Sequence, residues 1–140
     1  MKNYILYFVL GLFLSCSKDD NNRNNNPYIP EYNFSVSLDR NLPLYSGLNT
    51  PVNPILITNE NAGVKGIIVM KISDTDFRAW EANCPNQYPQ ECSRMTINGL
   101  NAKCPCDGIE YSIFTGVGSG PYTMKSYRVE VLGDIVRIYN

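Results

Sequence analysis

The residues of this sequence best suited to chemistry are its five cysteines, and no histidine accompanies them. Thiolates can bind soft metal ions, exchange disulfides or form structural bridges. Without histidine, Ser–His–Asp and Cys–His catalysis and histidine-based zinc chemistry are excluded. We therefore predict no catalytic residues and expect a protein that is not an enzyme. The four cysteines that lie close together in the sequence are Cys84, Cys92, Cys104 and Cys106.

The N-terminus is typical of an export signal with a lipid attachment site. Lys2 precedes an apolar stretch from 4 to 14, which suits a signal-peptide core and is too short to span a bilayer comfortably. The stretch ends in Leu-Phe-Leu-Ser-Cys, residues 12–16, which resembles the lipobox of bacterial lipoproteins. This resemblance implies a lipoprotein signal peptide over 1–15 and a lipidated Cys16 that holds the protein on a membrane. An ordinary secretory signal with an incidental cysteine is the alternative.

The segment after Cys16 is polar, with the charged run Lys18-Asp19-Asp20 and an asparagine-rich run from 21 to 26. Such a composition cannot bury enough apolar surface to offset its ordering entropy, so residues 16–31 are predicted to be a disordered tether. The expected location is the outer membrane or the cell surface, with the face of the membrane left open. The formal net charge of −1 gives no basic patch, and no nucleic-acid partner is expected.

The spacing of the four clustered cysteines and the predicted export of the chain indicate which chemistry these cysteines perform. Structural zinc sites have Cys-x2-Cys pairs, whereas the spacing here is Cys-x7-Cys-x11-Cys-x-Cys. Redox-active disulfides commonly use Cys-x-x-Cys, whereas this chain has Cys-Pro-Cys. In an exported chain, cysteines at this density favour structural disulfides. We expect disulfides and no bound metal, while a zinc or iron site and a redox-active disulfide stay as alternatives.

From Tyr32 onward the sequence predicts short strands. Apolar and polar residues alternate over 34–38, 77–81 and 127–131, and β-branched runs occupy 55–57 and 66–72. Gly133-Asp134 separates the last alternating stretch from 135–138, which predicts a terminal hairpin. No window predicts an amphipathic helix. We therefore predict one all-β domain, residues 32–140, built as an antiparallel sandwich or small barrel.

Two motifs in this domain occur in a recognisable order. Ala-Asn-Cys-Pro-Asn, residues 82–86, is followed by Cys-Pro-Cys-Asp-Gly, residues 104–108, and then by Thr115-Gly116, Gly120-Pro121 and the terminal hairpin. This order resembles the two cluster-binding loops of the Rieske iron–sulfur family and covers nearly all of 32–140. The resemblance implies a Rieske-like antiparallel β-sandwich with two cysteine-bearing loops at one tip.

A Rieske centre holds one iron with two thiolates and the other with two imidazoles. The resemblance puts Cys84 and Cys104 at the thiolate positions, but Asn86 and Asp107 at the histidine positions. A neutral amide oxygen and a hard carboxylate are poor replacements for imidazole. The 2Fe-2S cluster, and with it any cofactor, is therefore expected to be absent. The alternative is a 2Fe-2S electron-transfer protein with non-standard ligands.

The resemblance also implies a disulfide pairing and a function. Some Rieske proteins join their two loops by a disulfide, and Cys92 and Cys106 stand at the matching positions. Thiolates that share one iron lie close together, so Cys84 and Cys104 are expected to pair when the iron is absent. The implied protein is a membrane-anchored cell-envelope lipoprotein whose disulfide-stapled domain serves binding or structure. An unknown protein partner is expected at the loop tip, Cys84–Cys92 and Cys104–Gly108.

Overall fold

Six strands of the described residues coincide with the alternating and β-branched runs of the sequence. In the computed structural model, which describes residues 25–140, the strands predicted from those runs are β1 (Ser35–Asp39), β2 (Ile55–Ile57), β3 (Ile67–Lys71), β4 (Phe77–Glu81), β8 (Arg128–Leu132) and β9 (Ile135–Tyr139). Three further strands are β5 (Thr96–Asn98), β6 (Asn101–Lys103) and β7 (Glu110–Ser112). The helices of the described residues are two short 3₁₀ turns, η1 (Ser46–Asn49) and η2 (Glu91–Ser93).

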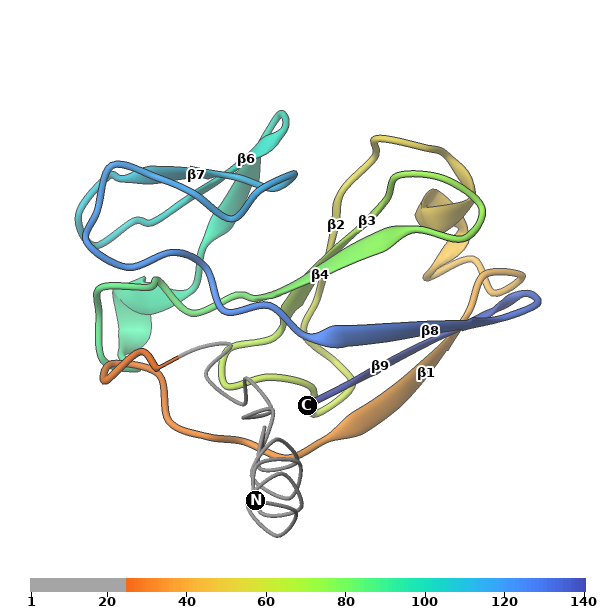
Figure 1. Ribbon diagram of the computed structural model, residues 1–140, viewed down its shortest axis with the longest axis horizontal. Coiled ribbons are helices and arrows are strands. Elements are labelled where there is room, and N and C mark those ends of the chain that lie inside the picture. Colours follow the sequence, from red (N-terminus) through yellow and green to blue (C-terminus); the bar gives the residue numbers. More distant parts are fainter. Residues whose placement is uncertain (1–24) are drawn as a thin grey trace, which may run out of the picture.

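The strands form three antiparallel sheets of three strands each. Their orders are β1-β9-β8, β2-β3-β4 and β5-β6-β7. Figure 1 shows β6 and β7 at one end of the molecule and β1, β8 and β9 at the other. The predicted all-β antiparallel fold with its cysteines in loops is confirmed.

The sheet β2-β3-β4 is central because both of its faces are covered. All five residues of β3 are buried. Successive side chains of a strand point to opposite faces, so Ile67 and Val69 pack in one core and Ile68 and Met70 in the other. The first core includes side chains of β1 and β9. The second contains Cys84 and Cys104, so the cysteine loops are part of a packed interior.

The sequence analysis missed the sheet that carries the second cysteine loop. Its strands β5, β6 and β7 have only three residues each, and most of their side chains are half-buried or exposed. Ala102 and Tyr111 are its fully buried strand residues and pack in the second core. The two-residue turn between β5 and β6 is Gly99-Leu100. A glycine at the first turn position is a known hairpin signal, and Gly99 has the positive φ of 62° that such turns require. That glycine was the available clue.

Residues 26–31, which the sequence analysis assigned to the tether, pack against the domain. The Asn26 side-chain amide donates a hydrogen bond to the Pro85 carbonyl oxygen at 2.6 Å. Ile29 is buried, and the Glu31 carboxylate lies 3.1 Å from the buried ammonium of Lys125. The packed part of the chain therefore begins before Tyr32.

The remaining N-terminal predictions lie outside the described residues. These are the signal peptide over 1–15, the lipidated Cys16 and the first part of the tether. Within 25–140 no helix has the length and hydrophobicity needed to cross a bilayer.

Candidate functional site

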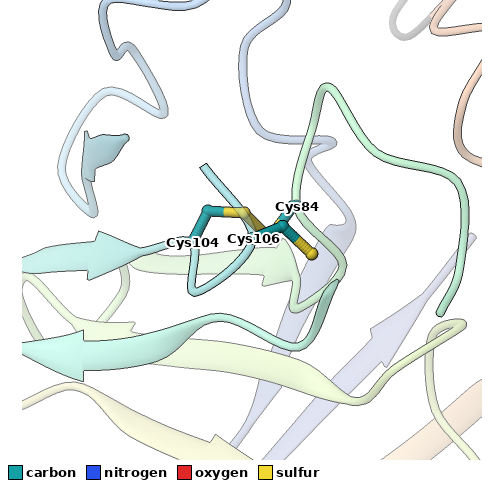
Figure 2. Close-up of side chains that lie close together, drawn as sticks. All are labelled: Cys84, Cys104 and Cys106. Atoms are coloured by element: carbon teal, nitrogen blue, oxygen red, sulfur yellow. A yellow bond between two sulfur atoms is a disulfide. The ribbon is translucent and has the colours of Figure 1, made fainter. Parts of the chain in front are cut away.

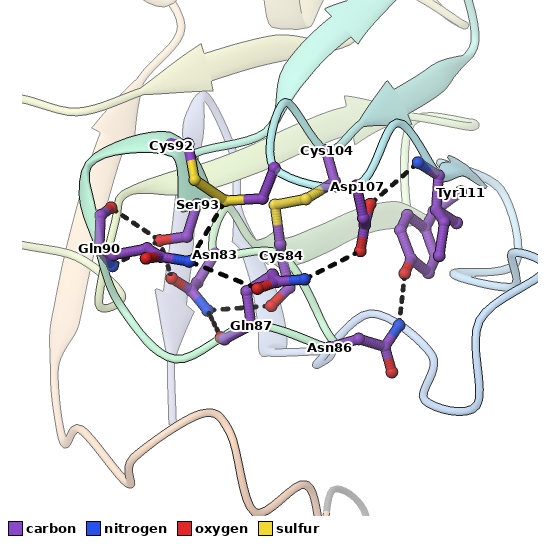
Figure 3. Close-up of a disulfide and its surroundings, with 12 residues drawn as sticks. Asn83, Cys84, Asn86, Gln87, Gln90, Cys92, Ser93, Cys104, Asp107 and Tyr111 are labelled. Carbon is purple, nitrogen blue, oxygen red and sulfur yellow. Dashed lines mark hydrogen bonds between the residues drawn. A yellow bond between two sulfur atoms is a disulfide. The ribbon is translucent and has the colours of Figure 1, made fainter.

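Two cysteine-bearing loops meet at one tip of the molecule (Figure 3). The first follows β4 and leads to β5, and it is closed by a hydrogen bond from the Cys84 N–H to the Ser93 carbonyl oxygen at 2.7 Å. The second joins β6 to β7 and is closed by a bond from the Cys104 N–H to the Ile109 carbonyl oxygen at 2.9 Å. The loops are thus positioned by the central sheet and by the sheet β5-β6-β7.

Two disulfides join these loops. One links Cys84 to Cys104, with Cα atoms 5.5 Å apart, and the other links Cys92 to Cys106, with Cα atoms 5.2 Å apart. These are the pairs that the family resemblance implied. We call Cys84–Cys104 the inner disulfide, because both residues are fully buried, and Cys92–Cys106 the outer disulfide, because Cys92 is exposed and Cys106 half-buried.

The two disulfides lie next to each other. The sulfur atoms of Cys84, Cys104 and Cys106 are all within 4.8 Å of one another. Figure 2 shows these three side chains close together. Metal coordination by cysteine requires the thiolate, and each of these sulfurs is bonded to another sulfur. In the oxidised protein this group therefore offers no thiolate ligand.

Asn86, at the first expected histidine position, joins the first loop to two other segments. Its amide N–H donates to the Tyr111 hydroxyl at 2.6 Å, and its carbonyl oxygen accepts from the Tyr122 backbone N–H at 3.1 Å. This position of the Asn86 side chain requires a glycine at 120, since a Cβ there would come within 2.3 Å of the Asn86 amide nitrogen. Burial raises the pKa of Tyr111, and the Asn86 hydrogen bond opposes this shift. Both ends of the Asn86 amide are therefore engaged within the protein.

Asp107, at the second expected histidine position, shapes the second loop. One carboxylate oxygen accepts from the Ile109 backbone N–H at 2.9 Å, in the manner of an Asx turn. The other accepts from the Gln87 side-chain amide of the first loop at 3.3 Å. The carboxylate is exposed and holds the loops in place from the outside.

This set of residues does not fit a Rieske 2Fe-2S cluster. Such a cluster requires two free thiolates and two imidazoles. Cys84 and Cys104 are bonded to each other, and Asn86 and Asp107 contribute oxygens that hydrogen-bond to the protein itself. We derive no chemistry at this tip through an iron–sulfur group.

A buried carboxylate anchors the first loop from the side of the central sheet. Glu81, at the end of β4, is fully buried and accepts hydrogen bonds from the backbone N–H groups of Val64, Lys65 and Asn83. It also accepts from the Tyr127 hydroxyl at 2.5 Å. Burial and the neighbouring Glu81 raise the pKa of Tyr127 well above its usual range. These bonds connect the start of the loop to the 64–65 segment and to Tyr127, which directly precedes β8.

A cluster of three tyrosines lies beside the first loop, and the sequence analysis missed it. The Tyr28 ring packs edge-on against the rings of Tyr88 and Tyr122, with centroid separations of 5.0 and 5.7 Å. Tyr88 is 64% exposed. Each tyrosine adjoins a proline in the sequence, which marks the three as loop residues. No local signal shows that they converge.

Replacing Asn86 with alanine is expected to lower the free energy of unfolding by about 2 kcal/mol, because the buried Tyr111 hydroxyl would lose its partner. The matched control is Gln87→Ala, which removes only exposed side-chain bonds and should change stability by less than about 0.5 kcal/mol. Guanidinium unfolding curves of both variants test this. Equal, small effects would show that Asn86 does not hold the tip together.

The chain was compared with known proteins. No family model matches it, and no curated protein matches it. Among solved structures, the ferredoxin of carbazole 1,9a-dioxygenase from Nocardioides aromaticivorans IC177 is 16% identical, with a TM-score of 0.44 over 66% of this chain and 90% of that one.

Two further solved structures are similar to this chain. A ferredoxin in complex with the oxygenase of carbazole 1,9a-dioxygenase is 24% identical, with a TM-score of 0.43 over 64% of this chain and 82% of that one. A Mycobacterium tuberculosis protein described as the small subunit of an NADH-dependent nitrite reductase is 12% identical, with a TM-score of 0.46 over 79% of this chain and 97% of that one. Because every score is below 0.5, nothing about cofactor, partner or activity is carried over.

Proposed function

We propose that this chain is a membrane-anchored cell-envelope lipoprotein whose Rieske-like domain has lost its 2Fe-2S cluster and serves as a disulfide-stapled binding or structural module. The observation that carries the proposal is the inner disulfide. Cys84 and Cys104, which the resemblance places at the two thiolate positions of a cluster, are bonded to each other inside the second core. The engagement of Asn86 and Asp107 in hydrogen bonds within the protein supports the same conclusion.

The loop tip is the proposed contact surface for a protein partner. Tyr88 exposes most of its ring there, next to the side-chain amides of Gln87 and Gln90. Exposed aromatic residues are enriched among the residues that contribute most to protein interfaces. Two disulfides fix the loops before binding, and a fixed surface loses less conformational entropy when it binds. These properties suit recognition rather than catalysis.

The lipidated Cys16 is proposed as the membrane attachment. Asn26, where the packed part of the chain begins, follows Cys16 after ten residue steps, with nine residues between them. A fully extended chain of that length spans roughly 35 Å, so the domain would be held close to the membrane surface. An anchor on either face of the outer membrane fits this length.

A 2Fe-2S electron-transfer protein with non-standard ligands is the second candidate. The observation in its favour is the convergence of three sulfur atoms within 4.8 Å, which after reduction would offer thiolates close together. It requires that Cys84 and Cys104 be unpaired in the working protein, with Asp107 and a fourth ligand such as a further cysteine completing the set.

A visible absorption spectrum with iron and sulfide analysis distinguishes the two candidates. The soluble residues 17–140, prepared without oxygen and incubated with iron, sulfide and a thiol reductant, are expected to be colourless and free of iron. The reason is that the chain has no imidazole and that the Asn86 and Asp107 side chains are engaged in hydrogen bonds within the protein. A coloured protein with matched iron and sulfide would overturn the proposal, and Asp107→Ala would then test whether that carboxylate is a ligand.

A further inference from the structure

The two disulfides differ in access to solvent. Cys84 and Cys104 are both 0% exposed, whereas Cys92 of the outer disulfide is exposed. Thiol–disulfide exchange requires a thiolate to reach one sulfur of the bond along its axis. An external thiol can therefore attack Cys92 directly, but it has no direct path to the inner disulfide in the folded protein.

Cys106 connects the two disulfides. Its sulfur belongs to the outer disulfide, yet it lies within 4.8 Å of both sulfurs of the inner one (Figure 2). Reacting atoms must approach to about 3–3.5 Å, so a small displacement of the second loop brings Cys106 into attacking range. Release from Cys92 would permit that displacement, because it removes one of the two covalent links between the loops.

A hydrogen-bond donor already faces this sulfur. The side-chain amide of Gln90 donates to the Cys106 sulfur at 3.5 Å. Hydrogen bonds to the charged form favour that form, so the same donor would stabilise a Cys106 thiolate after the outer disulfide opens. Cys106 therefore has both the position and the surroundings of a nucleophile.

We propose that Cys106 is a relay for thiol–disulfide exchange, through which a thiol outside the protein reaches the buried Cys84–Cys104 bond. In the first step an external thiolate attacks the Cys92 sulfur. A mixed disulfide forms at Cys92, the Cys92–Cys106 bond breaks, and Cys106 leaves as the thiolate. In the second step Cys106 attacks one sulfur of the inner disulfide. A new bond to Cys106 forms, the inner bond breaks, and the other inner cysteine leaves as a thiolate that takes a proton from solvent.

The exchange is completed by a second external thiol. This thiol attacks the mixed disulfide at Cys92, releases the oxidised external disulfide and leaves Cys92 as a thiol. Two external thiols are thus oxidised to one disulfide, and the protein is reduced by two electrons, from two disulfides to one disulfide and two thiols. The substrate class is a small or protein thiol in the compartment of the domain. The relay rests on the proposed function, because it requires the Cys84–Cys104 disulfide in place of a cluster, but it can fail while the proposed function stands.

Two matched variants test the relay in the full chain, with Cys16→Ser in every protein so that only the domain cysteines react. Cys92→Ser and Cys106→Ser both remove the outer disulfide and differ only in the thiol that remains. After alkylation under native conditions, peptide mapping of Cys92→Ser is expected to find Cys106 paired with Cys84 or Cys104. In Cys106→Ser, only the Cys84–Cys104 pair and an alkylated Cys92 are expected.

Reduction kinetics give a second readout. With glutathione as the external thiol, the remaining disulfide should be reduced at least about tenfold faster in Cys92→Ser, where exchange has moved it to the half-buried Cys106, than in Cys106→Ser, where it stays between the buried Cys84 and Cys104. Thermal unfolding of both variants checks that the loss of the outer disulfide weakens them equally. Equal rates, or rearranged pairs in both variants alike, would overturn the proposal.

Discussion

Replacing Cys84 and Cys104 together with alanine is expected to lower the free energy of unfolding by about 4 kcal/mol and the melting temperature by roughly 15 °C. The inner disulfide closes a loop with a sequence separation of 20, for which the chain-entropy estimate is about 3 kcal/mol. The rest comes from packing, because both sulfurs lie in the second core and their removal leaves a small cavity. Guanidinium unfolding without reductant measures the change.

The matched control for this experiment is the double replacement of Cys92 and Cys106 by alanine. Its sequence separation of 14 gives nearly the same loop-closure entropy, about 3 kcal/mol, but Cys92 is exposed and contributes little to the core. The inner pair should therefore be the more costly to remove by about 1 kcal/mol. If removal of the outer disulfide lowers the free energy of unfolding as much as removal of the inner one, the assigned core role of Cys84 and Cys104 is contradicted.

Replacing Glu81 with glutamine is expected to lower the free energy of unfolding by about 3 kcal/mol, although the two side chains have nearly the same shape. Each Glu81 oxygen accepts two hydrogen bonds, one from Val64 and Tyr127 and the other from Lys65 and Asn83. A glutamine presents an NH₂ group to one of these pairs. At least one backbone N–H would then face another donor inside the protein, which is more costly than the loss of an exposed bond.

Tyr127→Phe is the control for Glu81, since it removes one of the four donors and leaves the carboxylate in place. Its expected cost is about 1–2 kcal/mol, clearly below that of Glu81→Gln. Urea unfolding of both variants measures the difference. If Glu81→Gln proves no more costly than Tyr127→Phe, the backbone N–H groups of the 64–65 segment do not depend on this carboxylate.

A strand could be predicted from the sequence where its apolar residues alternate with polar ones or form a continuous run. β1, β4, β8 and β9 have apolar side chains that repeat at the strand period, and β2 and β3 are apolar runs rich in β-branched residues, so local patterning located all six. β5, β6 and β7 are three residues long and mostly polar. Their stability comes from hydrogen bonding to one another and from packing of Ala102 and Tyr111 in the second core, which no short window of sequence contains.

Some features of the candidate site could likewise be predicted from the sequence, and others depend on the folded chain. The lack of histidine and the positions of the four clustered cysteines can be read from the order of residues, because they concern which groups the chain possesses. The disulfide pairs followed from likeness to a family, since four cysteines alone allow three pairings. The proximity of Cys106 to the inner disulfide, the four bonds to Glu81 and the meeting of Tyr28, Tyr88 and Tyr122 came from the folded chain. These contacts join residues far apart in sequence, and they exist because the sheets pack in one arrangement that brings both loops to the same tip.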